Sequence, residues 1–578
     1  MSAALLRAAP ALTVAAFGLP IAAGLLGTVL PAFGHMPAIG VDQWGLQAWQ
    51  ALFDHPGFAT SLWLTLRIGL LATVLSVLLA VGLAGLLATR PAAARLGAWL
   101  APVLATPHSA LAIGLAFLIA PSGWLVRWVS PGLTGWALPP DATTVGHVSG
   151  LAVVACLLLK EVPYLVLMIL GALNQVAAPA QLAAARALGH SAASAFLKVL
   201  LPQVWPQIRL PVFAVLAFSL SVVDVALVLG PGNPPTLAVL ALRWFSAPDV
   251  QRYPQAAAAA LLLLGLVAAC LLAWHAADRL LARLGRRWIE RGGRGGAVVP
   301  ASALAAGAGL VLLALTALLL LALGLWSLAG AWRYPDALPS VWTLGNWQQQ
   351  GASLAGPAAN TALVALCATA VALVLTLACL ENESAGGVPA KRRAGPTGNT
   401  GRTSNTGGQR SLWLLYLPLL VPQVAFLFGA QVLLVRARLD ATYLAVVWTH
   451  LIFVLPYLYL SLADPWRAFD ARYARTGASL GASRWRVFWR IKLPILLKPT
   501  LIACAVAFAV SVGQYLPTLF AGSGRIATLT TEAVTLASGA DRRVTAVWAL
   551  LQALLPLAAF VLATALHRWC FAGRRGMA

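Results

Sequence analysis

Two adjacent charged residues, Lys160 and Glu161, lie near the middle of an apolar stretch at residues 147–171. A charge at the centre of a bilayer costs about 2.5–3.5 kcal/mol on insertion scales, so such residues usually face protein or a water-filled path and have partners. Neighbouring residues on a helix point about 100° apart, so we do not expect the two to pair only with each other. The pair fits a solute pathway, and it fits equally a structural ion pair with another helix.

Three further polar residues lie inside apolar stretches. Asp224 falls in the stretch at residues 209–230, and Gln514 and Tyr515 fall at similar depth in the stretch at residues 498–520. Polar groups that recur in corresponding helices are typical of a central cavity at a repeat interface, where transporters bind their substrates. Interhelical hydrogen bonds are the alternative, and a slightly simpler one.

A metal site is not expected. His35, Asp42, Asp54 and His55 share one polar segment, but their spacings match no metal-ligand motif. The six cysteines include no CxxC pair and fit small apolar packing positions. The polar stretch at residues 384–410 lacks the pattern GxxxxGK[ST] and is predicted to be a flexible insertion. We therefore expect this chain to bind no metal, cofactor or nucleotide.

The elements that position these residues are membrane helices. The chain of 578 residues is 60% hydrophobic and 10% charged, with a mean hydropathy of +0.84, which leaves too little polar surface for a soluble globule. About twelve stretches reach the roughly 20 apolar residues that a helix needs to cross a bilayer. We predict an all-α integral membrane protein with spans near residues 12–33, 61–88, 97–120, 147–171, 209–230, 254–275, 300–330, 358–380, 411–435, 440–462, 498–520 and 545–567.

The net charge of +23 follows from topology. With both termini placed on the cytoplasmic side, most of the 39 lysines and arginines fall in cytoplasmic segments, as the positive-inside rule requires. Nucleic-acid binding is therefore not needed to explain the charge. We expect a multi-pass protein of the inner, cytoplasmic membrane.

One segment occurs twice, once in each half of the chain. Residues 183–202 read AAARALGHSAASAFLKVLLP, and residues 475–494 read RTGASLGASRWRVFWRIKLP. Both copies place a glycine, an aliphatic residue and a final Leu-Pro at identical spacing; these are Gly189, Val199, Leu201 and Pro202, and Gly481, Ile491, Leu493 and Pro494. The pattern predicts two short helices joined at a left-handed glycine, with the proline ending the second helix or beginning a new one. Two copies indicate a duplicated half.

These repeat loops resemble the cytoplasmic EAA loop of ABC-importer permeases, whose form is EAA, three residues, Gly, nine residues, an aliphatic residue, one residue and Leu-Pro. In that family the loop is the coupling helix that sits in a groove of the ATPase subunit. The triplet here is Ala183, Ala184 and Ala185 in the first copy and Arg475, Thr476 and Gly477 in the second, so neither copy has the glutamate. The resemblance assigns ATPase coupling to the two triplets and to the matched Gly, aliphatic and Leu-Pro positions.

The resemblance covers most of the chain and implies a fused two-domain permease of a binding-protein-dependent ABC importer, similar to the ferric-iron, thiamine and phosphonate branch. It implies a first half at residues 1–275, a basic cytoplasmic linker at 276–299 and a second half at 300–578. It also implies two ABC ATPase subunits on the cytoplasmic face, which use the ATP, and a soluble binding protein on the outer face. The chain itself would then be no enzyme. Besides these partners we expect only membrane lipid around it.

An ion-gradient-driven secondary transporter is the alternative, because such proteins also use repeated halves and buried charges. Paired loops of the helix-Gly-helix-Leu-Pro form are not typical of that class, which favours the importer. A membrane-embedded enzyme is disfavoured, since no cluster of His, Asp and Ser stands out at one depth of the sequence.

Overall fold

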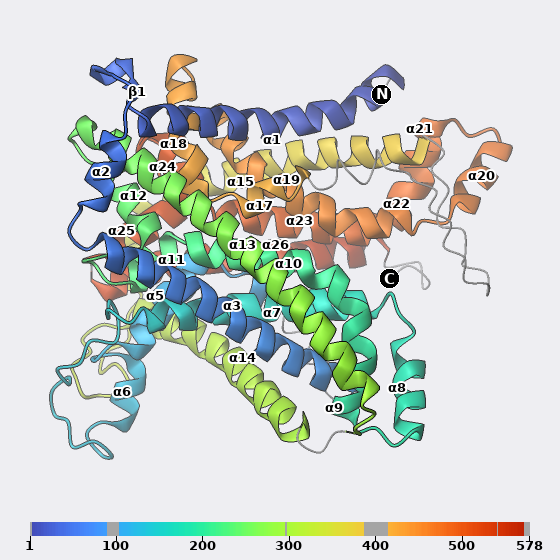
Figure 1. Ribbon diagram of the computed structural model, residues 1–578, viewed down its shortest axis with the longest axis horizontal. Helices are drawn as coiled ribbons and strands as arrows, with labels where there is room; N and C mark the ends of the chain where they lie inside the picture. The colour runs from blue at the N-terminus through green and yellow to red at the C-terminus, as the bar shows by residue number, and fades with distance from the viewer. Residues whose placement is uncertain (1–2, 90–102, 295–297, 386–413, 540, 572–578) are drawn as a thin grey trace.

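The computed structural model describes residues 3–89, 103–294, 298–385, 414–539 and 541–571, and almost all of its regular structure is helical. Long helices run side by side between two ends of the molecule (Figure 1). In the described ranges ten helices are long and apolar enough to cross a membrane, or eleven if one bent pair counts as a span. The prediction of an all-α integral membrane protein is confirmed, whereas the count of about twelve spans is not.

The first half begins with a long helix and a small two-stranded ribbon. Its elements are α1 (Ala3–Ala32), β1 (His35–Met36), a 3-10 turn (Pro37–Ile39), β2 (Val41–Asp42), α2 (Gln47–Phe53), α3 (Phe58–Thr89), α5 (His108–Ile119), α6 (Trp124–Val129), α7 (Leu151–Leu173), α8 (Ala178–Ala187), α9 (Ala192–Ala195), a π-helical turn (Phe196–Leu200), α10 (Leu201–Ser221), α11 (Asp224–Leu229), α12 (Leu237–Phe245), a 3-10 turn (Val250–Arg252) and α13 (Tyr253–Glu290). Strands β1 and β2 pair antiparallel.

The second half repeats much of this order. Its elements are α14 (Val298–Leu328), α15 (Gly345–Ala385), α17 (Leu417–Leu420), α18 (Gln423–Arg436), α19 (Tyr443–Arg467), α20 (Ala471–Ser479), α21 (Arg484–Val487), a π-helical turn (Phe488–Lys492), α22 (Leu493–Ile495), α23 (Leu497–Val512), α24 (Leu516–Gly522), α25 (Leu529–Ala537) and α26 (Arg542–Cys570).

Three predicted segments take a different form or lie outside the described residues. The span expected at 411–435 is represented by the short α17 and by α18, which has only 14 residues. Helix α13 continues to Glu290, so the first part of the predicted linker is a continuation of that helix. The predicted insertion at 384–410 lies almost entirely outside the described residues.

One hydrogen-bond arrangement occurs in both halves. The Thr65 hydroxyl on α3 accepts from the backbone N–H of Leu237 at 2.9 Å, and the Thr361 hydroxyl on α15 accepts from that of Leu529 at the same distance. Each hydroxyl also donates to the carbonyl oxygen four residues earlier, at 2.7 Å. A buried N–H at a helix start needs such an acceptor in a membrane protein. The shared contact therefore fixes α12 and α25 in equivalent positions.

The first helix of each half packs against the other half. On α1, a Cβ added to Gly27 would lie 2.8 Å from the Cα of Gly429 on α18, so the two backbones touch. Helix α14 packs in the same way against α3, where a Cβ on Gly82 would lie 2.4 Å from the Cβ of Ala305. Figure 1 shows α1 beside α18 and α14 beside α3. This exchange joins the two halves into one body.

Candidate functional site

The two repeat loops lie at one end of the molecule, the end that carries α8 and α20 in Figure 1. In both loops a short helix ends at a glycine with positive φ, +87° at Gly189 and +79° at Gly481. A residue without a Cβ adopts this conformation without steric cost. The predicted helix-Gly-helix shape is therefore present in both copies.

After the glycine, both loops continue with the same two features. Ser191 accepts a hydrogen bond from the N–H of Ser194, and Ser483 accepts one from that of Arg486, so each serine caps the next helix. A five-residue π-helical turn follows each cap, at Phe196–Leu200 and at Phe488–Lys492. Sequence reasoning missed both features, although a serine two residues after the glycine is a recognisable capping signal.

The third residue of each triplet is buried, while the first two are exposed. A Cβ on Gly477 would lie 2.7 Å from Cδ1 of Ile491, so the second triplet packs directly against its π-helical turn. In the first copy Ala185 belongs to a buried cluster against which Val199 packs. Ala183, Ala184, Arg475 and Thr476 face outward and are free to meet a partner.

Each loop also presents an exposed leucine directly before its glycine. Leu188 is 68% exposed and Leu480 is 82% exposed. Both copies thus expose a large apolar side chain at the same position of the loop. Both leucines can be matched in the sequence, but only the structure shows that they are exposed and do not belong to the core.

The Leu-Pro positions differ between the copies. Pro202 lies at the start of α10, and helical structure continues from Ala192 to Ser221 without a break. Pro494 lies in the three-residue α22, after which the chain bends by 75° into α23. Pro202 thus lies within continuous helical structure, whereas Pro494 lies in a short helix that ends at a bend, so the predicted helix boundary is present only in the second copy.

A buried lysine anchors each loop to a neighbouring helix. Lys198 donates to the carbonyl oxygen of Gly293 at 2.6 Å and lies 4.4 Å from the ring centre of Trp288 on α13. Lys492 forms an ion pair with Glu381 on α15 and lies 4.5 Å from the Trp466 ring. Each repeat loop is therefore tied by its lysine to the end of a long helix.

Lys160 and Glu161 have different partners in the protein interior. Lys160 donates to the carbonyl oxygens of Leu104 and Thr106, just before α5. The Glu161 side chain is only 8% exposed, and its Oε1 lies 3.4 Å from Nε2 of His108. As expected, the two residues do not pair only with each other. His108 was missed because nothing in the local pattern distinguishes it.

The remaining predicted path residues lie at helix breaks. Asp224 begins α11 immediately after the break that ends α10, and Gln514 and Tyr515 lie in the corresponding break between α23 and α24. Broken helices are where transporters expose backbone and polar groups to a solute. Asp224, Gln514 and Tyr515 are all half-buried.

These residues also lie near one another across the two halves. Asp224 interacts with His108 and Lys160 of the first half and with Tyr515 of the second. Glu161 likewise interacts with Tyr457 of the second half. The structure thus gathers Lys160, Glu161, Asp224 and Tyr515 around one polar interior. Gln514 takes part through its backbone, because its carbonyl oxygen accepts a hydrogen bond from the Thr518 hydroxyl at 3.0 Å.

Comparison with curated proteins identifies close relatives. The chain is 35% identical over 533 residues to the inner membrane ABC transporter permease protein YnjC of Escherichia coli (strain K12), covering 92% of this chain and 93% of that protein. It is 37% identical over 124 residues to the molybdenum transport system permease protein ModB of Mycobacterium tuberculosis, covering 19% of this chain and 47% of ModB. No protein-family model matches the chain.

Proposed function

This chain belongs to the inner-membrane permeases of ABC transporters, and we propose that it forms the solute path of an ATP-driven importer and couples that path to separate ATPase subunits. It is a multi-pass inner-membrane protein and a permease component rather than an enzyme. In the proposed complex the partner subunits hold the ATP, and this chain binds no cofactor of its own.

The matched surface of the two repeat loops carries the proposal. Exposed Leu188 and Leu480 stand on the same turn of two loops that share a left-handed glycine, a serine cap and a π-helical turn. Two repeat loops of similar shape at one end of the molecule would fit two copies of one partner. We therefore assign one ATPase subunit to each loop, on the cytoplasmic face, with both chain termini on that side.

The anchors Lys198 and Lys492 suggest how coupling would work. Approach of the two ATPase subunits would push the loops together, and the lysines would pass that movement to α13 and α15. Helices broken at Asp224 and at Tyr515 would then change the access to the polar interior. We propose Lys160, Glu161, Asp224, Gln514 and Tyr515 as the solute path, with His108 as an added member.

The remaining partners follow from the same proposal. A soluble binding protein would deliver solute at the end of the molecule opposite the repeat loops. The second loop is rich in exposed arginines, namely Arg475, Arg484, Arg486 and Arg490. These would meet acidic groups, either on the ATPase or on lipid headgroups.

The experiment is purification of the chain from its native membrane in mild detergent, with mass identification of co-eluting proteins, followed by uptake in proteoliposomes. We expect an ABC ATPase and a soluble binding protein to co-elute with the chain. We also expect uptake to require ATP. Elution of the chain alone, with uptake driven by an ion gradient and indifferent to ATP, would contradict the proposal.

A further inference from the structure

A cavity of about 270 Å³ lies at the end of the molecule opposite the repeat loops, between the two halves. Ile113 and Phe117 of α5 and Val228 of α11 form one wall, and the other wall includes Ala537, Arg542 and Thr545. None of the proposed path residues lines it. Since a water molecule occupies about 30 Å³ of liquid volume, the cavity has room for a small organic molecule.

The corresponding place on the other side of the molecule is filled by aromatic rings. Helices α5 and α18 both follow a proline, so Ile113 corresponds to Phe428; α12 and α25 each have nine residues, so Phe245 corresponds to Ala537. Val228 and Phe520 occupy the same position in α11 and α24, so they correspond. Thr545 and Tyr253 also correspond, because each lies four residues after a capping aspartate.

These four aromatic residues pack on one another. The rings of Phe245 and Phe428 stack with centroids 4.0 Å apart, Tyr253 meets Phe428 at 5.3 Å, and Phe520 meets Phe245 at 6.2 Å. The cavity exists because the four corresponding positions around it carry smaller side chains than these aromatic residues. It is thus a specific difference between two related sites rather than a general packing defect.

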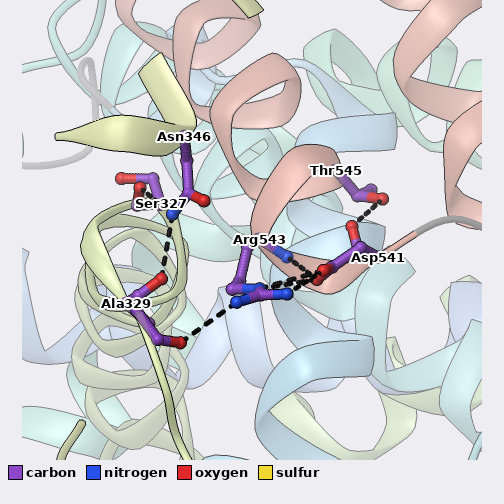
Figure 2. A network of polar contacts seen from close by, with 7 residues as sticks. Ser327, Ala329, Asn346, Asp541, Arg543 and Thr545 are labelled. Carbon is purple, nitrogen blue, oxygen red and sulfur yellow. Dashed lines mark hydrogen bonds and ion pairs between the residues drawn. The ribbon is translucent and has the colours of Figure 1, made fainter. Parts of the chain in front are cut away.

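Arg542 gives the cavity a positive charge without a carboxylate partner among the described residues. Its guanidinium donates to the carbonyl oxygen of Ser122 at 3.3 Å and lies 5.4 Å from the Trp326 ring and 5.9 Å from the Phe117 ring. The adjacent Arg543 is different, because its Nε lies 2.9 Å from Asp541 Oδ2 (Figure 2). Its Nη1 also donates to the carbonyl oxygen of Gly330. Asp541 is therefore already occupied by Arg543.

We propose that this cavity binds a small organic anion, a carboxylate attached to a compact apolar group. The apolar walls would bury the body of the ligand, and the guanidinium of Arg542 would pair with the carboxylate through two parallel hydrogen bonds. A bound anion would bridge α11 of one half to α26 of the other. This inference does not depend on the proposed function.

The test uses the full chain in nanodiscs of neutral lipid and measures equilibrium dialysis of radiolabelled benzoate. We expect saturable binding close to one per chain, and no comparable binding of benzyl alcohol, which lacks the charge. Arg542→Gln should weaken binding about tenfold or more, because a hydrogen-bonded ion pair is lost. Ala537→Phe, which copies Phe245, should also abolish binding by filling the cavity while leaving the charge in place.

The control is Arg525→Gln, which removes one exposed arginine and should bind benzoate like the unchanged chain. A monodisperse elution profile and an unchanged thermal midpoint identify folded variants, and Ala537→Leu serves if the phenylalanine variant misfolds. Absence of saturable binding, equal binding of benzyl alcohol, or binding indifferent to both cavity substitutions would overturn the proposal. Binding seen only after removal of a co-purified anionic lipid would also overturn it, in favour of a lipid headgroup.

Discussion

Gly477 and Ile491 are packed so closely that a Cβ on the glycine would lie 2.7 Å from Cδ1 of the isoleucine. The equivalent pair in the first repeat loop is Ala185 and Val199. Compared with the glycine and isoleucine, this pair has one more carbon atom at the first position and one fewer at the second. The two copies therefore conserve the total volume of the pair while changing both members.

This relationship predicts the effect of exchanging the pairs. Gly477→Ala gains about 1 kcal/mol of helix propensity, but overpacking costs about 1–3 kcal/mol, so we expect a net loss of stability. Ile491→Val in the same chain removes the closer of the two contacts, leaving Val487 Cγ2 at 3.2 Å from the new Cβ, and should recover part of the lost stability. Thermal midpoints of the two single variants and the double variant measure this coupling. Equal losses in Gly477→Ala and the double variant would refute it.

The left-handed glycines predict a contrast between two substitutions. No atom lies within 4 Å of a Cβ built on Gly481, so only its φ of +79° opposes a side chain. Valine is strongly disfavoured in this region and asparagine is tolerated. We expect Gly481→Val to abolish ATP-driven uptake while ATP hydrolysis continues, and Gly481→Asn to remain active.

Gly189→Val should act in the same way, with an added contact to Arg294, whose Nη1 would lie 3.3 Å from the new Cβ. The measurement is the ratio of solute taken up to ATP hydrolysed in proteoliposomes. Normal ratios in both valine variants would show that the loops do not dock through this turn.

Asp224 tests the solute path. We expect Asp224→Asn to lower ATP-driven uptake about tenfold, because the variant loses the carboxyl group at the break between α10 and α11. Asp42→Asn, an exposed change of the same kind, is the matched control. Uptake should be expressed per folded, ATPase-bound chain. A loss of thermal stability with unchanged uptake would instead assign Asp224 a structural role.

The paired threonine contacts predict equal effects in the two halves. Thr65→Val leaves the N–H of Leu237 without its acceptor, and Thr361→Val does the same to Leu529. Each change should cost about 1–3 kcal/mol, and the two costs should add because no partner is shared. Replacement by serine keeps the hydroxyl and should cost much less. Thermal unfolding of the full chain measures both losses of stability, and unequal losses in the two halves would contradict the prediction.

Asp541 predicts a pH-dependent contribution to stability. Hydrogen bonds from the Arg543 side chain and backbone lower the pKa of the Asp541 carboxyl below its ordinary value. A lowered pKa stabilises the folded state above the unfolded pKa of about 3.9, and the contribution is lost as pH falls through the folded pKa. Asp541→Asn should therefore have a lower thermal midpoint than the unchanged chain at pH 7, and the difference should shrink below about pH 4. A constant difference would contradict this assignment.

The sequence by itself determined the membrane class, the helical structure and the repeat loops. In a bilayer each backbone group must be satisfied within its own segment, so long apolar stretches have to be helices. The conformations of Gly189 and Gly481 are local preferences, which residue type and spacing reveal. Lys160, Glu161 and Asp224 stood out because charge in an apolar stretch is costly wherever the helix ends up.

Only the tertiary structure decided how these elements meet. The exchange of α1 and α14 between the halves depends on close backbone contacts such as Gly27 with Gly429, which neither segment reveals alone. The partners of Lys492 and Glu161, namely Glu381 and His108, are distant in the chain. The cavity beside Arg542 likewise arises from four separated positions whose side chains are small together. Such contacts depend on the packing of whole helices, and so local sequence patterns do not contain them.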